Sequence, residues 1–272
     1  MRKAFASILF CVPAALAVVP DARADGKPFV DVPLTLPPLH FGGEAGIGFG
    51  TYQPPGASTK VGWGSNFDAA IGLPFLGELG ARIGYRFGAD GVAAYANHYA
   101  RPFDPIMNEP GTNNFDNVEM HLRGSIVSVE VFELGLETRV VIPTDSNSVL
   151  AFTPGLPIRI HVPDFMRIDT GLWLSVPAES NPYYIYILDV PAQAYFQLGD
   201  AFVGPQTGVR FTNPGGGGGS YVEVPVGIGG GYTFGGVLDI KAQLRTEHIN
   251  STPAQAPPWG FGGGLGLGIR VP

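Results

Sequence analysis

The feature that most constrains this chain is a two-residue alternation of apolar and polar side chains, which recurs from His40 to the end of the sequence. It is clearest over residues 75–88, where the odd positions include Phe75, Leu79, Ala81, Ile83, Tyr85 and Phe87 and the even positions include Glu78, Gly80, Arg82, Gly84 and Arg86. Successive side chains of a β-strand point to opposite faces, so this alternation predicts strands with one apolar and one polar face. Because no stretch shows a capped helical periodicity, we expect an all-β fold.

Twelve strands are expected, and the connections between them alternate in length. The tight connections lie around Phe75, Glu130, Asp164, Gly199-Asp200 and Gly235, and the others are longer and rich in Gly, Pro, Asn and Asp. The expected strands are 40–52, 66–74, 77–88, 117–127, 132–142, 149–162, 166–176, 183–197, 201–212, 221–233, 237–248 and 259–271.

Alternation alone suits either a soluble β-sandwich or a barrel in lipid, so other features must decide between them. Charged residues make up 14% of the chain, against about 25% in ordinary soluble domains. The polar face carries mainly Gly, Glu, Asp and Arg rather than the Lys, Thr and Ser of a solvated sheet. Beyond Val19 no apolar run reaches the roughly 18 residues of a spanning helix, so a membrane would be crossed by strands. We therefore predict an antiparallel up-and-down transmembrane β-barrel with tight periplasmic turns and longer extracellular loops.

The N-terminus has the pattern of a secretory signal peptide over residues 1–24. Arg2 and Lys3 precede an apolar stretch, and Ala22-Arg23-Ala24 matches a cleavage site. Cleavage would make Asp25 the first residue and would remove Cys11, the one cysteine of the sequence. We expect residues 25–39 to be a short periplasmic lead-in and residues 40–272 to be the barrel domain.

The turn lengths also predict which charged residues meet across hairpins, because opposite positions in an antiparallel pair have a constant sum. Four inward-facing pairs are expected: Asp68 with Arg82, Arg123 with Glu137, Arg159 with Asp169, and Asp189 with Arg210. These pairs would either fix the register and hold the wall, at about 0.2–1 kcal/mol each, or create a transverse field that orients a polar solute. Acidic and basic residues are nearly balanced on the inward face, so strong ion selectivity is not expected.

The segment from Gly88 to Asp116 is the largest departure from a simple meander. Loops of this length are often functional. A candidate constriction is formed by Tyr95, His98, Tyr99, Arg101 and Phe103. The segment would fold into the lumen, lie outside as a contact surface, or have little role.

Other chemistry finds little support in the sequence. The five histidines are scattered without paired-ligand spacing, so neither a metal nor a cofactor is expected. Ser125 and Ser128 lie near His121, but alternation turns His121 inward and no orienting third group is present, so an enzyme is not expected. A formal net charge of −7 disfavours nucleic acid as a partner.

Over residues 40–271 the sequence resembles bacterial outer-membrane β-barrel proteins in the broad, porin-like sense, on the strength of the leader, the alternation and the turn pattern. One departure is the end of the chain, Ile269-Arg270-Val271-Pro272, because such barrels usually end in an aromatic residue. The resemblance implies an outer-membrane location with lipid as a partner. It favours a passive channel for small polar solutes; the alternative is a non-conducting structural or surface-contact barrel, closed by its own salt bridges or by the long loop.

Overall fold

The computed structural model describes residues 27–52, 60–74, 77–88, 99–104, 117–144, 149–180, 184–214, 219–246 and 260–272. Within these ranges the chain forms a short 3-10 helix, η1 (Phe29–Asp31), and β-strands. The strands are β1 (Phe41–Tyr52), β2 (Lys60–Leu73), β3 (Gly77–Gly88), β4 (Val118–Val129), β5 (Phe132–Ile142), β6 (Ala151–Val162), β7 (Met166–Pro177), β8 (Tyr186–Leu198), β9 (Ala201–Asn213), β10 (Tyr221–Glu223), β11 (Val226–Phe234), β12 (Leu238–Thr246) and β13 (Gly260–Val271).

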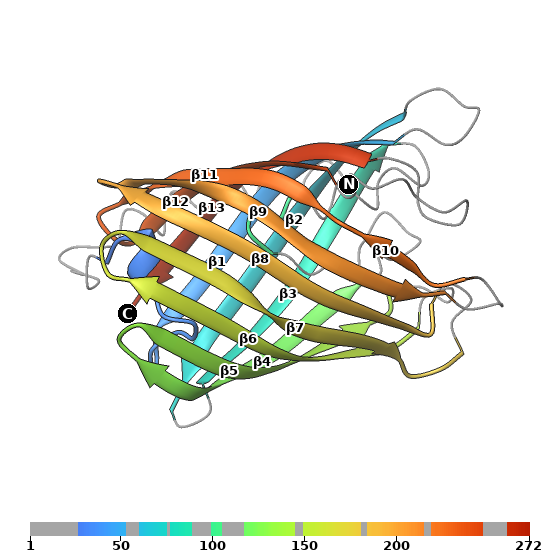
Figure 1. Ribbon diagram of the computed structural model, residues 1–272, viewed down its shortest axis with the longest axis horizontal. Helices are drawn as coiled ribbons and strands as arrows, with labels where there is room; N and C mark the ends of the chain where they lie inside the picture. Colours follow the sequence, from blue (N-terminus) through green and yellow to red (C-terminus); the bar gives the residue numbers. More distant parts are fainter. Residues whose placement is uncertain are drawn as a thin grey trace, which may run out of the picture.

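These strands close into one antiparallel barrel (Figure 1). Except at β10 and β11, each strand pairs with its neighbours in the sequence, and β13 returns to pair with β1 from Phe41↔Val271 to Tyr52↔Gly260. Both β10 and β11 pair with β9, so they are two parts of one barrel strand interrupted at Val224 and Pro225. Proline lacks the N–H that a ladder needs, which explains the interruption. The predicted all-β, twelve-stranded antiparallel barrel is confirmed.

Two details of the predicted strands are wrong. Strand β2 begins at Lys60 rather than at residue 66, and the expected strand 221–233 is broken as described above.

A third difference concerns the connection after β4. This turn holds two residues, Glu130 and Val131, rather than an odd number centred on Glu130, since Val129 pairs with Phe132. A β-bulge between Ser125 and Val127 then shifts the register by one residue. Beyond the bulge, the shorter turn and the shifted register cancel, so Arg123 pairs with Glu137 as expected.

The tight turns use residues that tolerate left-handed backbone. Gly199 has φ +66° in the connection between β8 and β9, and Asp164 has φ +60° in the connection between β6 and β7. Glycine adopts this conformation at no steric cost, and aspartate tolerates it better than most residues. In Figure 1 these turns lie at the same end of the barrel as the C-terminus and the blue segment that precedes β1.

The two faces of the wall differ as the alternation predicts. In β9 the inward positions Phe202, Gln206 and Arg210 are 1%, 3% and 5% exposed, whereas the outward Val203 and Val209 are 38% and 47% exposed. The outer wall is therefore an apolar surface of the kind that lipid covers, and the inner wall is polar. Among the described residues, no helix has the length and hydropathy needed to cross a membrane.

Candidate functional site: the barrel lumen

The lumen is lined by ion pairs, and the four pairs expected from the turn lengths are in register across their hairpins. The distances are 2.9 Å from Arg82 Nε to Asp68 Oδ2, 3.2 Å from Arg123 Nε to Glu137 Oε2, 2.6 Å from Arg159 Nε to Asp169 Oδ1, and 2.7 Å from Arg210 Nε to Asp189 Oδ1.

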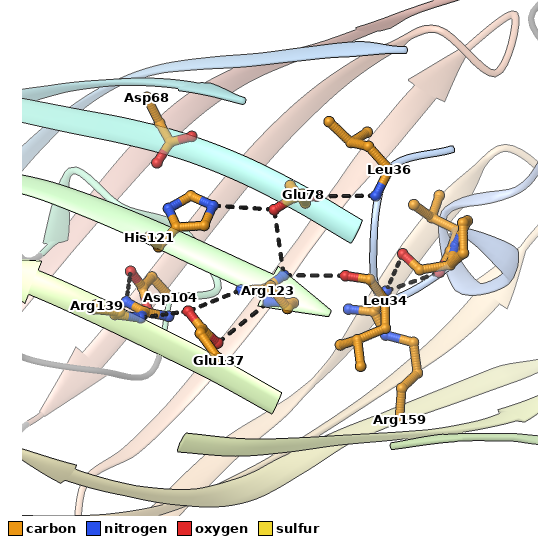
Figure 2. Close-up of polar contacts among 12 residues, drawn as sticks. Leu34, Leu36, Asp68, Glu78, Asp104, His121, Arg123, Glu137, Arg139 and Arg159 are labelled. Carbon is orange, nitrogen blue, oxygen red and sulfur yellow. Dashed lines mark hydrogen bonds and ion pairs between the residues drawn. The ribbon is translucent and has the colours of Figure 1, made fainter. Parts of the chain in front are cut away.

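Two of these pairs belong to a larger network that the hairpin registers alone do not reveal. Glu137 is 1% exposed and also accepts hydrogen bonds from Arg139 Nε at 2.7 Å and from Trp173 Nε1 at 3.3 Å. Arg139 Nη1 lies 3.2 Å from Glu119 Oε1, and Arg82 contacts the same carboxylate at 3.3 Å. Figure 2 shows Glu137 between Arg123 and Arg139. The network links β2, β3, β4, β5 and β7 around the lumen.

A piece of the long segment between β3 and β4 lies inside the barrel. Asp104 is bonded to both Arg82 and Arg139, and Gln243 of β12 donates to the carbonyls of Tyr99 at 3.2 Å and Arg101 at 3.3 Å. Of the five candidate constriction residues, Tyr99, Arg101 and Phe103 thus lie in the lumen. Tyr95 and His98 lie outside the described residues.

Glycines of β1 and β13 make room for this segment. A Cβ atom at Gly264 would lie 1.8 Å from Tyr99 O, and one at Gly46 would lie 2.0 Å from Ala100 O. A Cβ atom at Gly262 would lie 2.2 Å from the Tyr99 ring. The glycine-rich last strand therefore allows a backbone inside the barrel to approach the wall.

A second luminal segment, residues 27–40, precedes β1. Its backbone N–H groups donate to barrel side chains: Val30 to Gln197 Oε1 at 3.3 Å, Leu34 to Glu133 Oε2 at 3.0 Å, and Leu36 to Glu78 Oε2 at 3.0 Å. From the sequence we predict only a short periplasmic lead-in over residues 25–39. Its apolar Phe29, Val30 and Leu34, which are at most 6% exposed, are the signal that could have indicated burial.

The carbonyls of the same segment accept hydrogen bonds from the wall. Arg167 Nη1 donates to Phe29 O at 2.7 Å, His161 Nδ1 lies 2.7 Å from Val30 O, and Arg123 Nη1 donates to Leu34 O at 3.1 Å. Arg159 Nη1 donates to Val32 O at 2.9 Å and to Pro33 O at 2.8 Å. Figure 2 shows Arg123 reaching Leu34, and Glu78 reaching both Leu36 and His121.

An aromatic cluster joins the two luminal segments. The Phe29 ring stacks on Phe202 with centroids 3.8 Å apart, and it meets Phe103 of the inserted loop at 5.7 Å. Tyr195 contacts Phe29 edge-on at 5.5 Å, and the Arg167 guanidinium lies 3.9 Å from the centre of the Phe29 ring. The pre-β1 segment and the loop therefore pack against each other as well as against the wall.

A cavity of about 380 Å³ remains between these segments and the wall. Its lining combines charged groups of both signs, including Asp68, Arg82, Arg159, Asp169 and Lys241. Sites for small molecules commonly span about 300–1,000 Å³, so the space suits a small polar solute.

The inward histidines have structural partners. His121 Nε2 lies 3.1 Å from Glu78 Oε1, and His161 Nε2 lies 2.6 Å from Glu133 Oε1. Ser125, in contrast, is exposed and donates to Val127 O at 3.3 Å. Within the part of the chain that the structure describes, no three His, Cys, Asp or Glu residues are grouped to hold a metal ion.

Comparison with known proteins supports the fold. No protein-family model and no curated protein sequence matches the chain. Among solved structures, an outer membrane channel from Pseudomonas putida F1 is similar with a TM-score of 0.65 at 8% identity, covering 93% of this chain and 99% of that one. The translocator domain of the autotransporter NalP from Neisseria meningitidis matches with a TM-score of 0.46 at 13% identity, covering 98% and 97%. The closed antiparallel barrel and the likeness at a TM-score of 0.65 show that the chain has the fold of bacterial outer-membrane β-barrel proteins, with no narrower family shown.

Proposed function

We propose that this barrel is a passive channel for small polar solutes across the outer membrane. The observation that carries the proposal is the polar lumen: a wall of ion pairs surrounds a cavity of about 380 Å³, inside a barrel whose outer face is apolar. Charged groups are costly to bury, so a barrel that served only as a rigid plug would be better filled with apolar side chains. The resemblance in fold to an outer membrane channel supports the proposal.

A second candidate is a non-conducting structural barrel, which the filling of the lumen favours. Both residues 27–40 and residues 99–104 occupy part of the lumen, and the Phe29 and Phe103 rings bring the two segments into contact. In this candidate the two segments stay permanently in place and leave no continuous path for ions or solutes.

Conductance in a planar bilayer separates the two candidates. We expect unitary current steps from the purified full chain, and larger steps after deletion of residues 93–112, which include the luminal part of the loop. The absence of steps from the full chain, from this deletion and from a deletion of residues 27–38 would establish the non-conducting barrel.

Export and a non-enzymatic role complete the proposal. The proposed signal peptide, residues 1–24, lies outside the described residues, and sequencing of the mature N-terminus is expected to begin at Asp25. If the protein fractionates as a soluble periplasmic species whose gel mobility does not change on boiling, the membrane assignment is wrong. No catalytic residue is proposed. A serine nucleophile needs a neighbouring base, but Ser125 donates to Val127 O and His121 is bonded to Glu78.

A further inference from the structure

The hydrogen bonds between residues 29–36 and the turn end of the wall involve mainly the main chain of the segment, although the Asp31 carboxylate also accepts from Asp164 N. Side chains on the barrel accept from the N–H groups of Val30, Leu34 and Leu36. Other barrel side chains donate to carbonyls from Phe29 to Leu34. Main-chain amides are common to every peptide, so this pattern of donors and acceptors does not depend on the sequence of the occupant.

Proline falls where the wall supplies a donor but no acceptor. Pro33 has no N–H, and its carbonyl accepts from Arg159 Nη1 at 2.8 Å. The preceding Val32 carbonyl accepts from the same nitrogen at 2.9 Å. A short segment with one 3-10 turn at Phe29–Asp31, extended backbone at Val32 and a proline after it therefore satisfies the wall, whereas a continuous helix would keep its amides for itself.

One pocket does select a side chain. Phe29 stacks on Phe202 at 3.8 Å, contacts Tyr195 at 5.5 Å, and has the Arg167 guanidinium 3.9 Å from its ring centre. The division of roles is similar to that in other peptide-recognition sites, where hydrogen bonds to the main chain give affinity and a side-chain pocket gives specificity.

We propose that the turn end of this lumen is a peptide-binding site, occupied here by the chain's own residues 29–36, and that short oligopeptides with an aromatic residue bind there when this segment withdraws. The inference rests on the channel proposal and deepens it, since it names short peptides as the class of solute. The bound segment is tethered directly to β1, so its effective concentration is about millimolar. A free peptide therefore competes poorly until the segment is displaced.

The test uses a barrel that lacks residues 27–38 and a fluorescein-labelled synthetic peptide of that sequence. Fluorescence anisotropy is expected to show saturable binding to the deletion barrel, and binding at least about 100-fold weaker to the full chain, where the tethered segment competes. Heat-modifiable gel mobility establishes that the deletion barrel is folded. A folded deletion barrel that does not bind the peptide overturns the proposal.

Two changes distinguish backbone recognition from nonspecific insertion. N-methylation of the peptide amides equivalent to Leu34 and Leu36 removes the donors to Glu133 and Glu78, and is expected to weaken binding about tenfold or more. The Arg159→Gln barrel is expected to lose a similar factor. Arg210→Gln is the matched control, because Arg210 is also a luminal arginine that pairs with an aspartate, Asp189, and none of the hydrogen bonds described between the wall and residues 29–36 involves it. Equal binding by the methylated peptide, or equal loss in the two arginine variants, overturns the proposal.

If the deletion barrel does not fold, the full chain provides the measurement. The chain from Asp25 onward has no cysteine, so Lys27→Cys takes a single spin label at the exposed start of the segment. Millimolar unlabelled peptide is expected to increase the label's mobility in a saturable way, and an unchanged spectrum overturns the proposal. Peptide binding without conductance would refute the channel alone. Conductance without peptide binding would refute this inference alone.

Discussion

Replacing Glu137 with glutamine measures how strongly the luminal network stabilises the barrel. The Glu137 carboxylate is 1% exposed and accepts from Arg139 Nε at 2.7 Å, from Arg123 Nε at 3.2 Å and from Trp173 Nε1 at 3.3 Å. Glutamine keeps the shape and one acceptor oxygen but removes the negative charge between two guanidinium groups. The change thus isolates the electrostatic part of the contact.

The expected cost follows from the partners that remain. Removing one member of a buried ion pair destabilises proteins by about 3–5 kcal/mol. Arg139 keeps Glu119 at 3.2 Å, and Arg123 keeps the more distant Glu78 at 3.7 Å, so the lower end of this range applies. We expect Glu137→Gln to lower the free energy of unfolding by about 3 kcal/mol.

The matched control is Glu44→Gln, which removes the same charge from the same lumen. The Glu44 side chain is 27% exposed and pairs with Lys241 alone among the ion pairs described for it. Water screens such a pair, so the expected loss is about 0–1 kcal/mol. Urea unfolding of each barrel refolded in detergent, followed by tryptophan fluorescence, provides the comparison. If both variants lose the same amount, below about 1 kcal/mol, the network is screened by water and the reasoning is wrong.

Three further predictions test the wall from different sides. Gly264→Ala places a Cβ atom 1.8 Å from Tyr99 O and is expected to push residues 99–104 from the wall and raise single-channel conductance. The control Gly268→Ala, whose nearest neighbour would be Lys241 Cε at 3.4 Å, should leave the conductance unchanged. Equal conductance in the two variants would contradict the placement of the loop. A double-mutant cycle of Asp189→Asn and Arg210→Gln is expected to give a coupling energy of about 1–3 kcal/mol in urea unfolding, since both side chains are at most 6% exposed. Additive effects of the two substitutions would show that this pair does not stabilise the barrel. Leu265→Arg, on the outer face midway along β13, should lower the free energy of unfolding in lipid vesicles by about 2–4 kcal/mol. Leu198→Arg, at the end of β8, should lower it by about 0–1 kcal/mol. Similar losses in the two variants would mean that the outer wall does not contact lipid.

Much of the wall could be predicted from the sequence, because its physical requirements repeat every two residues. The faces of β9 follow from alternation alone, with Arg210 inward and Val209 outward. The register between β8 and β9 follows from a turn of two residues. The hairpin of β4 and β5 shows the limit of this reasoning, since Arg123 meets Glu137 only because the bulge after Ser125 offsets a shorter turn. A bulge leaves no reliable mark in the sequence.

The contents of the lumen could not be predicted in the same way. The bond from Leu34 to Glu133 joins residues 99 positions apart, and that from Gln243 to Tyr99 joins residues 144 positions apart. Neither luminal segment has a periodicity, because each is held by single contacts to several strands rather than by a ladder. Alternation therefore predicts which side chains face inward, but not which part of the chain they bind.

The balance of charge on the wall bears on what a channel of this kind would admit. Arg123 lies 3.2 Å from Glu137, and Arg159 and Arg167 share Asp169 at 2.6 Å and 3.0 Å, so neighbouring carboxylates neutralise part of their positive charge. What remains available to a solute is a set of fixed donors beside fixed acceptors, rather than a field of one sign. Such a wall discriminates weakly between small cations and anions, and it favours solutes that offer donors and acceptors together. Amides meet this requirement, and the main chain of residues 29–36 satisfies it in the structure itself.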